Sequence, residues 1–184
     1  MKALIFLVAA LLCVASGAQA QGPVYGKPMY DPASKSYFEL VHVTQAQAQG
    51  SMYPALPFDK AAHAATGRAF QGVAGRLAII RSQDTHIFIM QNLRPNEDTW
   101  IGLRYLCKTR ELRWVNGQQL KKGDFAPWHA QWDQSSGAGC VKGGGETDWM
   151  PVAYTPASSG FRWIAKGGKK IYVAYLVEYP TGKE

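Results

Sequence analysis

Aromatic, amide and acidic side chains gather in one stretch of the sequence, residues 118–170. Three tryptophans of this stretch stand beside polar or glycine residues: Trp132, Trp149 and Trp163. An exposed indole can stack on a sugar ring or anchor a protein partner, and the sequence leaves both possibilities open. The stretch is also rich in glycine, serine and proline, a composition typical of long loops that carry function.

Oxygen-bearing side chains in the same stretch raise the question of a bound cation. Calcium takes about six to eight oxygen ligands, mainly from carboxylates and carbonyls. The acids available are Asp133, Glu146 and Asp148, with the amide of Gln131 close to the first. Three dispersed acids in a glycine-rich loop are more often solvated charges, so we predict no metal or other cofactor. If calcium does bind, these three carboxylates are the candidate ligands.

The sequence gives no sign of catalysis. It has no nucleophile elbow, no zinc-binding helix signature and no glycine-rich phosphate loop after a strand. The four histidines show no metal-ligand spacing, and we expect His63 and His86 to be structural or surface residues. Only His129 lies close to Gln131. We therefore expect a binding protein and not an enzyme.

The segment before the loop predicts the scaffold that holds it. Residues 98–117 contain two runs of large, β-prone residues around the polar residues 108–111, which predicts a β-hairpin. We expect Trp100 and Trp114, one in each run, to lie in the core. An isolated hairpin cannot bury such a surface, so it must pack against helices and further strands.

The flanking segments supply those elements. Residues 36–43 predict the first strand, residues 77–80 a short buried strand, and residues 170–179 the last strand, which Pro180 ends. An alanine-rich helix is predicted from about residue 56 to Gly72 and Gly75, with an inner face of Ala62, Ala65, Ala69 and Val73.

A second helix is predicted between Ser82, a favourable N-cap, and Pro95. Its predicted inner face is Ile87, Met90 and Leu93. The order of elements predicts an α+β fold, with two helices packed on antiparallel strands.

The first twenty residues predict an export signal: Lys2, an apolar run over residues 3–14, and the small-residue site Ala18-Gln19-Ala20. Residues 21–35 contain three prolines and predict an irregular lead-in, followed by one domain over residues 36–180. We expect a periplasmic or extracellular protein with no membrane span, and the oligomeric state stays open. Loss of Lys2 lowers the formal net charge from +7 to +6, and the scattered charges predict no nucleic-acid partner.

Export leaves two cysteines, Cys107 and Cys140, in a compartment that permits disulfides. One bridge between them is therefore predicted. The chain-entropy model gives such a bridge a stabilisation of about 3 kcal/mol.

The ordered motifs resemble those of the C-type lectin-like domain family. Trp-Ile-Gly-Leu, residues 100–103, resembles the family's most characteristic tetrapeptide. Other matches follow in the family's order: residues 37–41, the alanine-rich helix, residues 75–82, residues 112–117, Trp128, Cys140-Val141 and residues 175–179. The resemblance covers about residues 36–179. It implies a C-type lectin-like fold in which the first and last strands pair, Trp128 lies in the core, and the long loop carries the ligand site.

The sequence departs from the family at the calcium-dependent sugar site. Sugar-binding members hold calcium with a Glu-Pro-Asn or Gln-Pro-Asp motif and a later Trp-Asn-Asp. The first motif is replaced by Gln131-Trp132-Asp133, and a cis peptide without proline costs about 3 kcal/mol. Residues 148–150 and 163–165 are the candidates for the second, and neither has Asn-Asp after its tryptophan. The cysteines also differ, as in bacterial-type members, so Cys107–Cys140 would be a substitute bridge.

We therefore predict a secreted C-type lectin-like protein that recognises carbohydrate through the long loop, with weak or no calcium dependence. The candidate ligand-binding residues are Gln131, Trp132, Asp133, Glu146, Asp148, Trp149 and Trp163. The alternative is a calcium-independent module for a cell-surface protein, acting in adhesion, host contact or envelope assembly.

Overall fold

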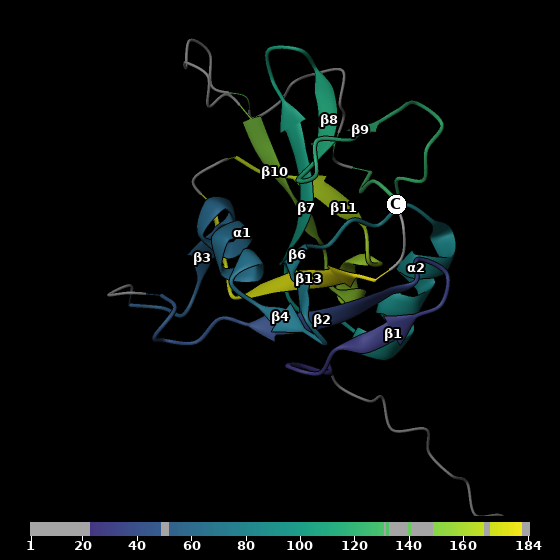
Figure 1. Cartoon of the computed structure of the whole chain (residues 1–184). Coiled ribbons are helices and arrows are strands. Elements are labelled where there is room, and N and C mark those ends of the chain that lie inside the picture. Colours follow the sequence, from purple (N-terminus) through teal and green to yellow (C-terminus); the bar gives the residue numbers. More distant parts are fainter. Residues whose placement is uncertain are drawn as a thin grey trace, which may run out of the picture.

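The structure is a computed structural model, and it describes residues 23–48, 52–130, 132, 140, 149–167 and 170–181. Within these residues the largest feature is a nine-stranded sheet (Figure 1). Its path runs through β1 (Met29–Asp31), β2 (Ser36–His42), β13 (Ala174–Pro180), β7 (Thr99–Leu106), β10 (Trp149–Tyr154) and β11 (Trp163–Ala165). β6 (Arg76–Leu77) pairs with β13, while β8 (Glu111–Trp114) pairs with β7 and with β9 (Gln119–Leu120). The pairing of β13 with β7 is parallel.

Two short strand pairs and the helices complete the fold. β3 (Leu56–Pro57) pairs with β12 (Ile171–Tyr172), and β4 (Ala69–Phe70) pairs with β5 (Val73–Ala74). The helices are α1 (Phe58–Thr66) and α2 (Gln83–Phe88), which continues into the π-helical turn η1 (Ile89–Leu93), and the 3-10 turn η3 (Ala157–Ser159). None of the helices in the described ranges is long and apolar enough to cross a membrane.

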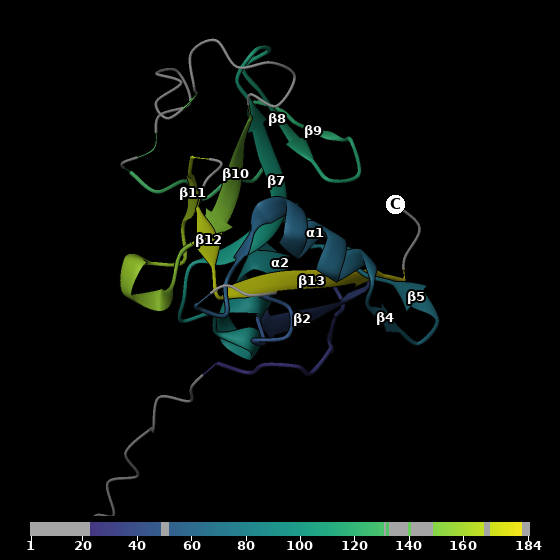
Figure 2. The ribbon, with the colours of Figure 1, turned by 90° about the vertical axis from the view of Figure 1, so that its left-hand side faces the viewer.

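The alternation of side chains along β7 divides the interior into two cores. Trp100 packs with Phe58 and the buried alanines of α1, and this core also contains Tyr175 and Val177 from β13. Ile101 and Leu103 point to the other face, where they join Ile89 and Leu93 of η1. Figure 2 shows α1 lying over the strands from one side. The sheet is thus covered on both faces, as an α+β fold requires.

The predicted hairpin and the pairing of the first and last predicted strands are confirmed. β7 pairs with β8 in a register that sets Leu103 opposite Trp114, and the side chains of Trp100 and Trp114 are 0% and 2% exposed. β2 and β13 pair antiparallel over their whole length, with Leu40 opposite Leu176. The first and last strands of the domain therefore lie side by side.

The alanine-rich helix is shorter than predicted. α1 ends at Thr66, and Ala69 and Val73 belong to β4 and β5 instead of a helix face. The chain turns between these strands at Gln71 and Gly72, which both have positive φ angles, 51° and 79°. A helix cannot pass through two such residues, so the alanine spacing was misleading.

The inner face of the second helix also differs from the prediction. The Ser82 side chain caps α2 as predicted, accepting a 3.2 Å hydrogen bond from the Thr85 amide. Ile87, however, is 36% exposed, whereas Ile89 and Leu93 are fully buried. The buried residues of α2 and η1 are Thr85, His86, Ile89 and Leu93. The inner face therefore keeps helical spacing but begins at two polar residues, so it passes one position before Ile87 and Met90, and only Leu93 was predicted correctly.

Four further boundaries were wrong. The lead-in contains β1, which pairs with β2, so it is partly regular. Of residues 77–80 only Leu77 belongs to a strand, although all four residues are buried. The last predicted strand is interrupted at Val173, which separates β12 from β13, and the predicted long loop contains β9, β10 and β11.

Candidate functional site

The described part of the candidate site is an aromatic cluster at the end of the sheet where the long loop leaves it. Of the predicted ligand-binding residues, the structure describes Trp132, Trp149 and Trp163. The other four, Gln131, Asp133, Glu146 and Asp148, lie outside the described residues, so their predicted roles stay predictions.

Trp163 is a core residue and not a loop residue. It begins β11, where it pairs with Tyr154 of β10, and its side chain is 0% exposed. The indole packs edge-to-face against Trp114 and Trp128, each with ring centroids 5.7 Å apart. A ring enclosed in this way presents no face to a ligand, so the prediction of Trp163 as a stacking platform is wrong.

Trp132 and Trp128 form a stacked pair at the start of the long loop. Their ring centroids are 4.1 Å apart and their planes meet at 35°. Trp132 also meets Tyr105 of β7 edge-to-face at 5.9 Å. Both tryptophans are half-buried. Trp128, which was predicted to lie in the core, packs against the core and is only partly buried. The pair therefore combines a fixed position with a partly accessible surface.

Backbone hydrogen bonds hold this pair on β11. The Trp163 amide donates to the Pro127 carbonyl at 2.8 Å, and the His129 amide donates to the Trp163 carbonyl at 2.8 Å. The Trp132 amide in turn donates to the His129 carbonyl at 2.9 Å. His129, for which we predicted a place near the site, thus contributes through its backbone.

Trp149 is the first residue of β10, opposite Leu106 of β7, and not part of a loop as predicted. Its half-buried ring meets Phe58 of α1 edge-to-face, with centroids 5.2 Å apart. The guanidinium carbon of Arg104 lies 5.4 Å from the centroid of the same ring, in cation–π contact. The sequence reasoning missed Arg104, because only the strand register brings it to Trp149.

The predicted disulfide is present. Cys107 and Cys140 are bonded, with their Cα atoms 5.9 Å apart. Cys107 directly follows β7, and the loop residue Cys140 packs against the same core. The bridge therefore ties the long loop to the end of the hairpin.

One of the two candidates for the second calcium motif, residues 163–165, offers no side-chain oxygen after its tryptophan. The two residues after Trp163 are Ile164 and Ala165, which are 9% and 5% exposed and belong to the two cores. Across the described ranges, no three His, Cys, Asp or Glu side chains lie close enough together to hold a metal ion. The three acids predicted as candidates are outside those ranges.

Residues 68–164 match the family model of the lectin C-type domain, over more than half of the chain. The chain belongs to this family. No curated protein matches its sequence.

Solved C-type lectin domains share the fold at low sequence identity. The carbohydrate-recognition domain of cow CD23, crystallised in the presence of GlcNAc2Man3 oligosaccharide, has a TM-score of 0.56 and 15% identity, covering 89% of this chain and 100% of that one. The mouse scavenger receptor C-type lectin carbohydrate-recognition domain has a TM-score of 0.51 and 13% identity, covering 81% of this chain and 91% of that one. Ovocleidin-17 of the Gallus gallus eggshell has a TM-score of 0.52 and 16% identity, covering 84% of this chain and 96% of that one. At such identities these likenesses show the fold alone.

This C-type lectin domain also has a groove that the sequence did not reveal. It encloses about 440 Å³ between α2, residues 125–127 and residues 160–162. His86 lies in it with 8% exposure, and its Nδ1 is 2.8 Å from the Tyr154 hydroxyl. Burial, helped by the positive charge of Arg162, lowers the pKa of His86 to about 4. The imidazole is therefore neutral at pH 7, in keeping with the structural role predicted for it.

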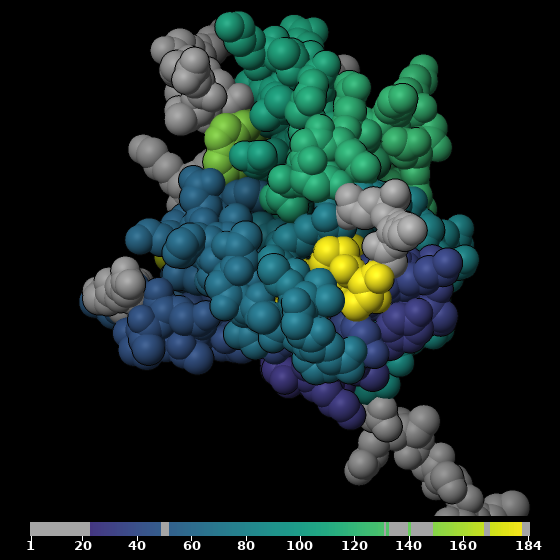
Figure 3. All heavy atoms as spheres, in the orientation of Figure 1, coloured from purple at the N-terminus to yellow at the C-terminus, as the bar shows by residue number. Residues whose placement is uncertain are grey.

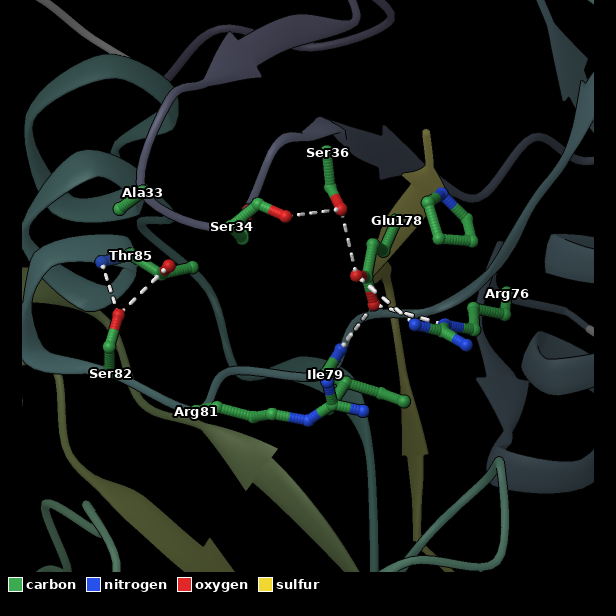
Figure 4. A pocket seen from close by; sticks show the side chains of 10 residues that line it. Ala33, Ser34, Ser36, Arg76, Ile79, Arg81, Ser82, Thr85 and Glu178 are labelled. Atoms are coloured by element: carbon green, nitrogen blue, oxygen red, sulfur yellow. Dashed lines mark hydrogen bonds and ion pairs between the residues drawn. The ribbon is translucent and has the colours of Figure 1, made fainter. Parts of the chain in front are cut away.

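A second groove of about 260 Å³ lies beside the end of β13. Figure 4 shows Glu178 inside it, facing Arg76 and the backbone of Ile79. The carboxylate accepts from Arg76 Nε at 3.1 Å, from the Ile79 amide at 3.0 Å and from Ser36 Oγ at 3.2 Å. Because these polar groups already satisfy one another, we assign this groove a structural role.

Proposed function

We propose that this C-type lectin domain binds carbohydrate where the long loop leaves the sheet, with weak or no dependence on calcium. The observation that carries the proposal is the stacked pair of Trp128 and Trp132, half-buried and fixed by backbone bonds to β11. A rigid, partly exposed indole offers apolar surface to a sugar ring with little loss of conformational freedom. Two of the solved relatives are named as carbohydrate-recognition domains, which also supports the proposal.

The chemistry of residues 163–165, a candidate for the second motif, supports weak calcium dependence. Ile164 and Ala165 carry no side-chain oxygen, and both are buried. Gln131-Trp132-Asp133 lacks the proline that aims the first motif at the metal in calcium-binding members. The candidate carboxylates Asp133, Glu146 and Asp148 would then give calcium fewer oxygen ligands than the roughly six to eight it prefers.

A glycan array run with and without a chelator tests both parts of the proposal. We expect at least one glycan to bind, with signals in the two conditions agreeing within about twofold. Trp132→Ala should weaken that binding by about tenfold or more, equivalent to about 1.4 kcal/mol, because the stacking surface is lost. Tyr30→Ala is the matched control, since Tyr30 is an exposed aromatic residue (46%) on β1, at the other edge of the sheet.

Three outcomes would contradict the proposal in different ways. Loss of all binding in chelator contradicts the calcium part. Unchanged binding by Trp132→Ala contradicts the location of the site. If no glycan binds while a cell-surface protein is captured in a Trp132-dependent manner, the protein-binding alternative is the better account.

We further propose that the protein is exported and cleaved after Ala20. The apolar run and small-residue site at the start of the sequence support this, and so does the pairing of Cys107 with Cys140. Intact mass measurement of protein recovered from the periplasm or the medium should give a chain that begins at Gln21 and carries one disulfide. Protein that keeps residues 1–20, or stays in the cytoplasm, would contradict the proposal.

A further inference from the structure

A row of basic side chains crosses the sheet on the face that α1 covers, beyond the N-terminal end of α1. Arg104 follows Trp100 by four residues along β7, so it points to the same face. Arg113 of β8 lies directly opposite Arg104, and Pro151 of β10 lies opposite it on the other side. The Lys166 amide donates to the Pro151 carbonyl at 2.9 Å, so the Lys166 backbone lies beside Pro151, next in line after Arg104.

Arg113 belongs to β8, which lies above α1 in Figure 3. The space-filling view shows the green atoms of β8 and β9 standing above the blue atoms of α1 on the face turned to the viewer (Figure 3). Neighbouring strands are about 4.8 Å apart, so Arg113, Arg104 and Lys166 span three strand spacings, about 14 Å. This is a length suited to an extended ligand of several sugar units.

The positive charge of the row is only partly compensated by described residues. Arg113 pairs with Glu111, its Nη2 lying 2.9 Å from the carboxylate. Arg104 makes no hydrogen bond or ion pair within the described part of the chain, and its Nε is buried there without a partner. Like charges directly opposite each other on a sheet are destabilising, and a half-buried donor without an acceptor costs free energy. An anionic ligand beside the two arginines would offset the repulsion between them.

Trp149 fixes the position of the Arg104 guanidinium. The ring lies 5.4 Å from the guanidinium carbon, and Phe58 holds the ring from the side of α1. The guanidinium is thereby preorganised, and its planar fork matches the oxygens of a carboxylate or sulfate. Trp149 is thus a positioning residue for Arg104, and it is the residue at which β10 begins.

We propose that Arg104, with Arg113 and Lys166 beside it, binds the anionic group of an acidic saccharide. The proposal rests on the carbohydrate binding proposed above and names its ligand class: sugars that carry a carboxylate or a sulfate. The excess positive charge of the chain, formally +7 and +6 without Lys2, would further attract such a ligand.

Titration calorimetry with tetragalacturonate and its neutral methyl ester tests the inference on the full mature chain. We expect the acid to bind about tenfold or more tightly than the ester. Arg104→Gln should remove about this tenfold preference and leave the affinity for the ester unchanged. Lys27→Gln removes the same charge next to β1, at the opposite edge of the sheet, and should change both affinities by less than about twofold. A heparin-derived tetrasaccharide reports whether sulfate serves as well as carboxylate.

The outcomes separate this inference from the proposed function. If neutral glycans bind through Trp132 while acid and ester bind equally, the inference is wrong and carbohydrate binding stands. The inference is also overturned if Arg104→Gln and Lys27→Gln weaken acid binding equally, because only net charge then matters. Absence of binding to every saccharide overturns both. A denaturation curve for each variant shows that it is folded, and Arg104→Lys, which keeps the charge but not the fork, should restore only part of the preference.

Discussion

Replacing Glu178 by alanine is expected to lower the free energy of unfolding by about 3 to 5 kcal/mol, the usual cost of breaking a buried ion pair. Glu178 is 4% exposed, and its carboxylate accepts hydrogen bonds from Arg76, the Ile79 amide and Ser36 (Figure 4). The substitution leaves the buried Ile79 amide without its hydrogen-bond acceptor. It also leaves the largely buried Arg76 guanidinium without the carboxylate that balances its charge. Desolvated groups of this kind cannot recover the loss by turning to water.

Glu111→Ala is the matched control, because it also breaks a short Arg–Glu pair. The Arg113–Glu111 side chains are 43% and 29% exposed, against 18% and 5% for Arg76–Glu178. A solvent-exposed pair contributes about 0 to 1 kcal/mol, so this variant should be close to wild type. Urea denaturation at pH 7 measures both, and equal costs for the two variants would show that burial does not set the strength of the Glu178 pair. Arg76→Met/Glu178→Leu should recover part of the loss.

The position of Glu178 in β13 could be predicted from the sequence, but its role could not. The last strand reads as a nearly continuous run of apolar residues with β-branched and aromatic members, and its type follows from such local composition. Which groups meet Glu178 depends on β2 and on the chain around β6, both far away in the sequence. The hairpin, like the last strand, could be predicted locally: its two strands and the burial of Trp100 and Trp114 follow from residue type.

The candidate site was predicted less well, because burial in it is set by pairing between distant segments. Trp163 stands beside Arg162 and Phe161 in a stretch rich in polar residues and glycine, so local composition favours a loop. In the structure that stretch contains a strand of three residues, β11, whose position is set by β10. No local pattern marks so short a strand. Arg104 was missed for the same reason, since its neighbours Arg113 and Trp149 become visible only once the register is known.

The scaffold and the site depend on each other through Phe58. This first residue of α1 meets Trp100 at 5.8 Å and Trp149 at 5.2 Å, both edge-to-face. The core tryptophan of the hairpin and the tryptophan that positions Arg104 therefore share one aromatic neighbour. The absence of the family's calcium motifs does not affect this aromatic contact. The fold therefore still holds Trp149 and Arg104 in fixed positions where β10 begins.

A second large effect is expected on acidification, and it depends on His86. Burial lowers the pKa of this imidazole to about 4 in the folded protein, against about 6.5 in an unfolded chain. A depressed pKa of this kind gives a stabilisation that is complete above pH 6.5 and is lost as the pH falls toward 4. The shift corresponds to about 3 kcal/mol of unfolding free energy, at about 1.4 kcal/mol per pH unit.

Comparison with His86→Gln isolates this contribution. Glutamine stays neutral throughout, suits a helix and can still hydrogen-bond the Tyr154 hydroxyl, which burial keeps protonated by raising the pKa of Tyr154. Other titrating groups act equally in both proteins, so the difference between their urea stabilities at pH 7, 5.5 and 4 reports His86. We expect the wild type to lose about 3 kcal/mol relative to the variant over this range. Parallel pH profiles would mean that the imidazole charges without cost, and hence that the groove beside α2 admits water to it.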